Sequence, residues 1–427
     1  MNFFKKIKAG ALQYVLVISV IIAIIIFAFI SLVYLQQRMS IKHHFTKVAI
    51  ANVQMGFDFL KQKKVTYNLE TPIHFSDNEE AITTLIKKHW GIFDVAIVNS
   101  KVKNEFFQKV GLLGLQNPKR DAVYLQDNNN ALVLVGKTKI TGTVSLPRQG
   151  VKSGNISGES YYGNELIYGR RKASTSSLPK IKNIEYLKDF YRNYYTDDLE
   201  NFELEDALKL HQSFTENTLL YEDVNSILLE NISLSGNIII SSKTAIVIKA
   251  SAVLENIILI APKISIEKNT KGNFQAIAKK SIEVQPNCTL KYPSALILLP
   301  EEKNTTSQII TNQQSKPIDE TSIHISKNSE VKGVVVYYSE NKTSNYKTQI
   351  QIDEKSTIKG EVYCSKNLEL QGTVFGTVYT NNFIVKKSGG IYINHVYNGV
   401  INATELPIQY AGIQINNESN SVVKWMD

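Results

Sequence analysis

The chain has 427 residues, a formal net charge of +9 and two cysteines. This length suffices for two or three domains with a sizeable apolar core. The positive charges are scattered, and the tight basic run Arg170–Lys172 is too small to predict a nucleic-acid-binding surface. The two cysteines, Cys288 and Cys364, lack the spacing of a metal site, and a disulfide between them is left open by the sequence.

The amino-terminal segment is predicted to be a retained membrane anchor. A basic segment, residues 1–8, precedes residues 9–37, which contain no Asp, Glu, Lys or Arg. The apolar run over 14–35 matches the ~20 residues with which a helix crosses a hydrocarbon core of ~30 Å. It is longer than the ~7–15 apolar residues of a signal peptide, and no small-residue cleavage site follows it. We therefore predict a transmembrane helix over residues 9–35.

The orientation of this anchor is predicted from the charges beside it. Three lysines precede the span, and Arg38, Lys42 and Lys47 follow it, so the positive charges are balanced. The free amino terminus and the tighter packing of the first cluster favour a cytoplasmic amino terminus. A long carboxy-terminal domain can be translocated regardless of its own charge. We expect a single-pass membrane protein whose bulk is extracytoplasmic.

Residues 36–62 are predicted to continue the helix as an amphipathic extension. One helical face is marked by Ile41, Phe45, Val48, Asn52, Met55 and Phe59. An apolar first half and an amphipathic second half resemble the long first helix of type IV pilins and pseudopilins, and KKIKAG resembles a prepilin leader. The resemblance implies processing between Gly10 and Ala11. The family carries Glu at the fifth mature position, whereas this chain has Val15.

Residues 63–135 are predicted to form a small α+β region. The segment SDNEEAITTLIKKHWG begins with the capping-box spacing of Ser76 and Glu79 and ends at Gly91, which predicts a helix. The segments VAIVNS and ALVLVGKTKITGTV are rich in alternating aliphatic residues, which predicts strands.

The most regular part of the chain lies over residues 226–410. From Ile246, three units of 18 residues each open with two aliphatic residues two positions apart. The segments that start at Ile323 and Ile350 share the pattern I-x-I-x-x-x-S-x-[VI]-K-G-x-V at an offset of 27. Alternation predicts strands, and a fixed offset predicts stacked coils with glycine at corners that need a positive φ. We predict a mainly β fold with a β-solenoid, a parallel β-helix of coils of about 18 residues; a sandwich of short strands is the alternative.

Three further segments are assigned relative to this β-solenoid. The turn pattern I-x-G-x-V also occurs at Ile140, Gly142 and Val144. Residues 136–162 are therefore predicted to be solenoid-like strands, and residues 163–225 a Tyr-rich, acidic insertion. Residues 411–427 are predicted to be a carboxy-terminal cap in which Trp425 covers the last coil.

The turns of the carboxy-terminal part resemble those of bactofilins, the polymer-forming β-helical scaffold proteins. The resemblance covers mainly residues 320–400 and implies a right-handed β-helix that associates end to end. Bactofilins are largely bare solenoids, whereas this chain adds a predicted membrane span and a separate region close to the amino terminus.

The Tyr-rich insertion supplies candidate ligand-binding residues. Tyr186, Tyr191 and Tyr194 could offer aromatic faces to a sugar, although at helical spacing such residues more often pack a core. This platform is the sequence-based hypothesis for a binding site.

Catalytic and metal-binding patterns are weak in this sequence. Glu255, Glu267 and Glu283 fall at different positions of the three 18-residue units, so stacking aligns no acid/base pair. The seven histidines have no metal-ligand spacing. We expect no enzyme activity, cofactor or bound metal.

These observations predict a membrane-anchored structural or scaffold protein of the cell envelope. Its expected partners are the lipid bilayer through residues 9–35, and either further copies of itself or an envelope protein or glycan, with no nucleic acid. The alternatives are a cell-surface glycan-binding module and a polysaccharide-active β-helix enzyme.

Overall fold

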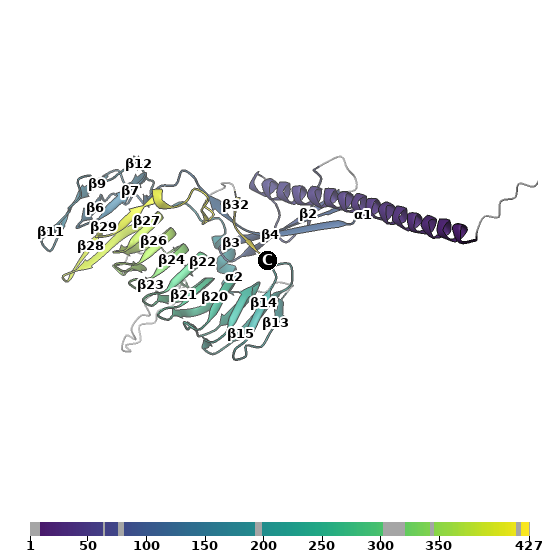
Figure 1. The fold of residues 1–427 in the computed structure, drawn as a ribbon. Coiled ribbons are helices and arrows are strands. Elements are labelled where there is room, and N and C mark those ends of the chain that lie inside the picture. The colour runs from purple at the N-terminus through teal and green to yellow at the C-terminus, as the bar shows by residue number, and fades with distance from the viewer. Residues whose placement is uncertain are drawn as a thin grey trace, which may run out of the picture. The chain divides into compact units, whose positions relative to one another are not determined.

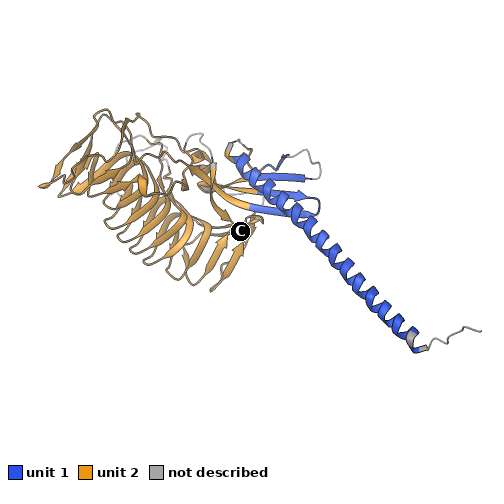
Figure 2. Cartoon of the chain, turned by 45° about the horizontal axis from the view of Figure 1, so that its top comes forward, with its two compact units in different colours: residues 1–60, 69–86, 98–109 blue, residues 61–68, 87–97, 110–427 orange. Residues whose placement is uncertain are grey.

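The computed structural model describes residues 9–62, 65–75, 81–192, 199–301, 321–341, 346–415 and 420–426. Over these residues the protein is mainly β, with a long helix at its amino terminus (Figure 1). Two compact units are distinguished (Figure 2): unit 1 holds residues 1–60, 69–86 and 98–109, and unit 2 holds residues 61–68, 87–97 and 110–427. Three strands contribute residues to both units: β2 (Ala81–Trp90), β3 (Phe93–Val102) and β4 (Glu105–Gln116).

Helix α1 (Ala9–Gln62) is the longest element of the described chain, with 54 residues. It runs without interruption through the predicted span and the predicted extension. The large apolar side chains of its first half are exposed, with Leu12 at 70% and Leu35 at 53%. A continuous apolar helix at the amino terminus is therefore confirmed.

The buried face of α1 coincides only in part with the predicted face. Asn52 is buried, and three further residues of that face are half-buried, namely Phe45, Val48 and Phe59. Ile41 and Met55 of the predicted face are exposed, at 57% and 39%. The helix turns Gly56 toward β3 and packs closely against Val98. A Cβ on residue 56 would lie 2.6 Å from Cγ1 of Val98, so glycine permits this close packing of the helix on the strand. The buried apolar residues recur every three or four positions, as amphipathic packing requires, at Ala49, Val53, Phe57 and Leu60.

A strand replaces the helix that was predicted over residues 81–90. Within unit 1, β1 (Thr71–Ile73) pairs antiparallel with β2, and Thr71 lies opposite Leu85. The burial of β2 largely alternates with period two, and the segment ITTLI contains four β-branched residues, which favour strands. Ser76 and Glu79 lie outside the described residues. Over 65–75 and 81–135 the described chain contains strands and turns but no helix, so the α+β prediction is wrong there.

The carboxy terminus joins an antiparallel sheet in unit 2. Two strands pair antiparallel with β4: β31 (Ala411–Gly412) and β32 (Asn420–Met426). Trp425 lies opposite Gly111 of β4 and remains 41% exposed. The prediction that Trp425 covers the last coil is therefore wrong, because other strands occupy that place.

The rest of unit 2 is dominated by one continuous, mainly parallel sheet that closes around a single apolar core. Four smaller groups of described residues accompany it: the sheet of β6 (Leu132–Val135), β9 (Val151–Ser153) and β29 (His395–Tyr397), the hairpin of β10 (Asn155–Ile156) and β11 (Glu159–Ser160), the helix α2 (Ile184–Arg192) and the 3-10 helix η1 (Ala403–Glu405). The strands of the large sheet are β5 (Val123–Leu125), β7 (Lys139–Thr141), β8 (Val144–Leu146), β12 (Arg171–Ala173), β13 (Leu199–Asn201), β14 (Lys209–Gln212), β15 (Thr218–Asp223), β16 (Ile227–Leu229), β17 (Ser233–Gly236), β18 (Ile238–Ser242), β19 (Ala245–Ile248), β20 (Val253–Ile266), β21 (Lys271–Val284), β22 (Thr289–Leu298), β23 (Ser322–Ile325), β24 (Glu330–Tyr337), β25 (Ile350–Ile352), β26 (Thr357–Leu370), β27 (Thr373–Lys387), β28 (Gly390–Ile393) and β30 (Val400–Asn402).

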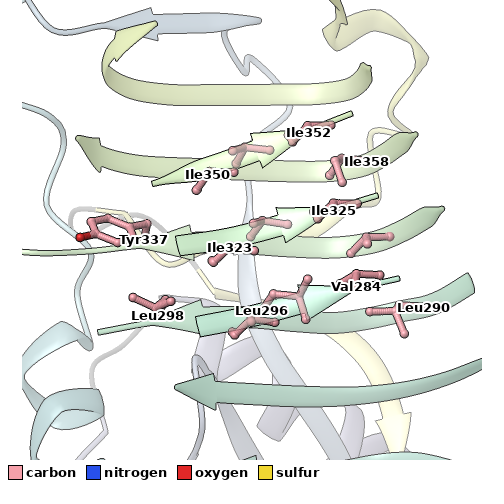
Figure 3. Close-up of a cluster of buried hydrophobic side chains, with 14 of the residues drawn as sticks. Val284, Leu290, Leu296, Leu298, Ile323, Ile325, Tyr337, Ile350, Ile352 and Ile358 are labelled. Atoms are coloured by element: carbon pink, nitrogen blue, oxygen red, sulfur yellow. The ribbon is translucent and has the colours of Figure 1, made fainter. Parts of the chain in front are cut away.

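The predicted offsets appear as strand register. Ile264 pairs with both Ile246 and Ile282, each 18 residues away. Ile323 pairs with Ile350 at the predicted offset of 27. Equivalent aliphatic side chains consequently form buried rows through the core; in Figure 3, one such row contains Val284, Ile325 and Ile352.

Glycines mark one corner of the stacked strands, as predicted. Gly333 pairs with Gly360, and Gly360 pairs with Gly376, at φ values of +142°, +149° and +147°. These values lie in a region that side-chain-bearing residues rarely adopt. Gly142 has φ +123°, and its neighbours Ile140 and Val144 are fully buried, so the I-x-G-x-V prediction is also confirmed.

The strands are not stacked in chain order. β5 pairs in parallel with β27, β7 pairs with β30, and β12 pairs with β8. Residues 121–173 therefore lie beyond the strands that end near residue 402. In Figure 1 the blue strands β6, β7 and β9 lie beside the yellow strands β27 and β29. The prediction placed residues 136–162 before the first coil, whereas in the structure β7 pairs with β30 and β8 pairs with β5, beyond the strands that end near residue 402. This placement also explains why the carboxy terminus does not cover those strands.

The predicted insertion over 163–225 is shorter in the structure. β13 pairs in parallel with β15, and β14 pairs in parallel with β17, so the stacked strands begin at residue 199. The aliphatic alternation is weak here because these first strands are only partly buried, as β14 shows. Their polar sequence therefore gave little signal for a strand.

Candidate functional site: the apolar helix, two buried carboxylates and the end strands

The exposed apolar part of α1 is the first candidate functional element. Within Leu12–Lys61, an 18-residue window has a mean hydropathy of 3.3, and none of it is buried. Among the described residues, this is the one helix that is long and apolar enough to cross a membrane. Gly10 and Ala11 lie in its first turn, and Gly10 is exposed. Processing between these two residues stays a prediction.

The predicted tyrosine platform is only partly described. Tyr186 lies in α2 (Ile184–Arg192), and its ring stacks on His89 at 3.8 Å between centroids. His89 in turn stacks on Tyr67 at 3.7 Å. Tyr186 therefore packs within a three-ring stack. The side chain of Tyr191 and the whole of Tyr194 lie outside the described residues, so the platform stays a prediction.

Asp94 is the centre of a buried polar cluster that sequence reasoning missed. Its side chain is fully buried and forms an ion pair with Lys87 Nζ at 2.9 Å. Burial alone would raise the pKa of Asp94, but the hydrogen bond to His89 and the charge of Lys87 lower it to about 2. The same carboxylate also accepts hydrogen bonds from Tyr67 Oη at 3.0 Å, Asn183 Nδ2 at 3.1 Å and Gln414 Nε2 at 2.9 Å, and contacts His89 Nδ1 at 3.0 Å.

This cluster joins segments that are far apart in the chain. Lys87 and His89 come from β2 and Asp94 from β3, whereas Asn183 precedes α2 and Gln414 follows β31. An ionised carboxylate without solvent is tolerated only when it is paired and hydrogen-bonded. The arrangement therefore holds these segments of unit 2 together and offers no open site to a substrate. The only sequence signal was the set of charged residues within apolar strands.

Glu361 is the second buried carboxylate, and it lies beneath the carboxy-terminal segment. Its Oε2 accepts a hydrogen bond from the Ile413 backbone N–H at 2.7 Å. Nearby, Tyr410 Oη donates to the Gly333 carbonyl at 2.9 Å, and the Arg120 guanidinium lies over the Tyr410 ring. Burial raises the pKa of Glu361 to about 7, although the Ile413 N–H and Arg120 act in the opposite direction.

The raised pKa of Glu361 predicts a pH-dependent stability. The folded protein binds this proton more tightly than the unfolded chain, so the contribution is full below pH 4.5 and is lost as pH rises through about 7. We expect Glu361→Gln to flatten the decline of the unfolding temperature between pH 5 and 8. Glu330→Gln is the control, because Lys359 and Lys332 lower the pKa of Glu330 despite its partial burial. An unchanged slope in Glu361→Gln would contradict the assignment.

A row of tyrosines on the stacked strands is covered by the chain itself. The rings of Tyr124, Tyr379, Tyr363 and Tyr338 follow one another with centroids 6.3, 6.1 and 6.4 Å apart. The segment after β12 returns along this row, because Tyr124 Oη accepts from the Thr175 N–H and Tyr363 Oη donates to the Pro179 carbonyl. These aromatic residues hold the returning segment in place.

The cysteines and other potential metal ligands form no site. Cys288 and Cys364 are both buried and free, so the disulfide that the sequence left open is not formed. Burial raises the pKa of Cys364 to about 12, which keeps it a neutral thiol. Among the residues that the structure describes, no group of three or more His, Cys, Asp or Glu is placed to hold a metal ion.

Within the described residues, each of the two end strands of the stack is paired along one edge. The pairings of the described chain join β12 to β8 and β13 to β15. β12 and β13 lie at opposite ends of the stacked strands (Figure 1). Unpaired edges of this kind are potential sites for the addition of a further strand.

Comparisons with known proteins give one structural match. No protein-family model matches the chain, and no curated protein does. Among solved structures, the competence-associated pilin ComZ from Thermus thermophilus is matched over 89% of this chain and 97% of that chain. The sequence identity is 8% and the TM-score is 0.18, so the match carries no argument about function. The resemblance to bactofilins stays a prediction.

Proposed function

We propose that this protein is a membrane-anchored scaffold of the cell envelope, in which the stacked strands form a β-solenoid that presents a stiff surface to partners. The observation that carries this proposal is the exposed apolar run of α1, with a mean hydropathy of 3.3 and no burial. Apolar surface of this extent is stable in a bilayer and costly in water. The proposal assigns the chain no catalytic step.

The register of the stacked strands supports the proposed role as a stiff scaffold. Rows such as Ile246, Ile264 and Ile282 repeat the same inward position in successive strands. Each strand then buries its apolar face on its neighbours, which is how repeat proteins obtain an extended and continuous core. The proposed orientation keeps the amino terminus in the cytoplasm and exports the rest of the chain.

Membrane retention of the full chain tests the proposal. We expect the wild-type protein, with a carboxy-terminal tag, to stay in the membrane pellet after alkaline and high-salt washes. Ile22→Lys combined with Ile25→Lys is expected to release most of it, since each lysine near a span centre costs about 2.5–3.5 kcal/mol. Both residues are half-exposed in the structure, so the substitutions disturb no packing.

A matched variant distinguishes insertion from general loss of hydrophobicity. Met39→Lys combined with Ile41→Lys changes two exposed apolar residues of the same helix outside the predicted span, and it is expected to leave retention unchanged. Protease digestion from the outer face should remove the tag. Release of the wild-type chain by the washes would overturn the anchor, and protection of the tag would overturn the proposed orientation.

A further inference from the structure

The first and last strands of the stack belong to one column of parallel strands. Successive pairings lead from β13 to β15 and end with β8 and β12. The strands between them are β18, β20, β21, β22, β24, β26, β27 and β5. Both end strands therefore run in the same direction on the same face of the stack. A second copy placed at either end continues the column without reversing a strand.

The main-chain groups of the end strands are oriented for such a continuation. In β12, the Arg170 carbonyl accepts from the Val144 N–H, and the Ser174 N–H donates to the Leu146 carbonyl, both at 2.8 Å. Because alternate residues of a parallel strand bond to opposite sides, Arg171 and Ala173 turn their main-chain groups toward the open edge. The same alternation applies to β13, where the Phe202 N–H donates to the Leu220 carbonyl at 3.2 Å.

The β12 end is basic. Arg170 and Arg171 are exposed, and Lys172 pairs with Asp121 at 2.9 Å. A groove of about 530 Å³ adjoins this strand and brings two cations from another segment, Lys119 and Arg120, beside Arg170 and Lys172. The Nη2 atom of Arg120 is buried and has no hydrogen-bond partner within the described chain. Such a donor is stabilised when an acceptor reaches it.

The β13 end is acidic. Four exposed carboxylates lie within seven residues there, with Lys209 as the neighbouring cation, and they are Glu200, Glu203, Glu205 and Asp206. Within the described residues no ion pair involves these four carboxylates. The strand register also relates a cation at the β12 end to a carboxylate near the β13 end. Residues paired in register from strand to strand lead from Lys172 of β12 to Glu222 of β15. The observed register of β13 and β15 ends with Asn201 opposite Leu220, and the same offset carried two residues further assigns Glu203 to the position opposite Glu222.

We propose that copies of this chain associate head to tail, with the basic β12 end of one copy against the acidic β13 end of the next. The proposal rests on the scaffold function proposed above and gives that function a polarity. Main-chain hydrogen bonds between the open edges supply adhesion, and the opposite charges select the partner end and the register.

The test uses the full chain in detergent micelles, with its mass distribution followed by sedimentation at low salt. We expect the wild-type chain to form a series of oligomers that shortens as salt rises. Reversing either end, with Arg170→Glu and Arg171→Glu or with Glu203→Lys and Glu205→Lys, should reduce the weight-average mass to that of one chain per micelle. Lys291→Glu with Lys327→Glu is the matched control, because both residues are exposed and distant from the end strands in the chain.

Restoration distinguishes this contact from general charge effects. A chain that carries both reversals, or an equimolar mixture of the two singly reversed chains, should recover the oligomers. A second arm uses Ala173→Pro, which removes an edge donor without touching the side that pairs with β8, with Ala173→Thr as its control. Ala173→Pro should lower the oligomer fraction at least fivefold.

Specific outcomes overturn the proposal. Oligomers that persist in both singly reversed chains would place the contact elsewhere, for example on α1 or on another protein or glycan partner. A doubly reversed chain that stays single while the control associates would also refute the pairing of these two ends. Membrane retention is measured separately, so loss of the anchor would not be confused with failure of head-to-tail association.

Discussion

Replacing Gly360 with alanine is expected to destabilise the stacked strands by about 3–5 kcal/mol. Its φ is +149°, and an added Cβ would lie 1.9 Å from the Gly333 carbonyl oxygen and 2.6 Å from Tyr410 Oη. Gly333 cannot yield, because it is itself paired with both Gly360 and Ser294. The loss should appear in chemical unfolding of the full chain followed by circular dichroism.

Gly389→Ala separates backbone strain from the steric clash. Gly389 also has a positive φ, +74°, but nothing lies within 4 Å of the position of its Cβ. We expect this substitution to cost only about 1 kcal/mol. Equal losses at the two positions would show that the close approach between neighbouring strands contributes little. A Gly360→Ala chain of wild-type stability would refute the corner role of this glycine.

The stacked strands were predictable where one physical rule repeats. Inward aliphatic residues at Ile246, Ile264 and Ile282 must occupy equivalent positions if successive strands are parallel, and the observed register places them so. The corner glycines followed from the same rule, because a corner with positive φ excludes most side chains. The fixed offset between repeated segments of the sequence therefore predicted which residues of the central strands pair.

The order of the strands was not predictable from local patterns. β5 pairs with β27, although some 250 residues separate Val123 from its partner Val378. An aliphatic strand of three residues can pair with many parallel strands, so its sequence does not specify which strand is its neighbour. The segment ITTLI of β2 similarly satisfied a helical pattern and a strand pattern, and pairing with β1 decided for the strand.

The candidate functional features likewise divide into those that one segment of sequence predicts and those that depend on contacts between distant segments. The apolar part of α1 was predicted because a membrane span is a property of one segment. The Asp94 cluster was missed because its partners come from separate segments, as Asn183 and Gln414 show. The end strands were missed as a pair because their shared column depends on the complete stacking order. Sequence patterns report local periodicity, whereas these sites depend on long-range register.

Replacing Asp94 with asparagine is expected to cost unit 2 about 3–5 kcal/mol of unfolding free energy. The substitution keeps the size of the side chain but leaves the Lys87 ammonium, whose side chain is only 4% exposed, without its counter-ion. The hydrogen bonds from Tyr67 and Gln414 also lose a charged acceptor. Trp90 is 6% exposed, close to the cluster in sequence, and its fluorescence offers a local probe of unfolding.

Two further variants test whether the charge is responsible. Asp121→Asn removes an ion pair whose Lys172 side chain is 56% exposed, so its cost should stay below about 1 kcal/mol. Adding Lys87→Met to Asp94→Asn should recover part of the loss, because it removes the unpaired buried cation. A double variant less stable than Asp94→Asn alone would instead assign the effect to packing around Lys87.

The pH dependence supplies an independent check on Asp94. Its folded pKa is lowered to about 2 from an ordinary value of 3.8, so its contribution is full above pH 4 and is lost as pH falls toward 2. Asp94→Asn should therefore remove part of the acid-induced loss of stability in that window. Glu361 acts in the opposite sense and over a higher range, since its folded pKa is about 7. The two buried carboxylates together should confine maximal stability to mildly acidic conditions, and each single variant should broaden the profile on its own side only.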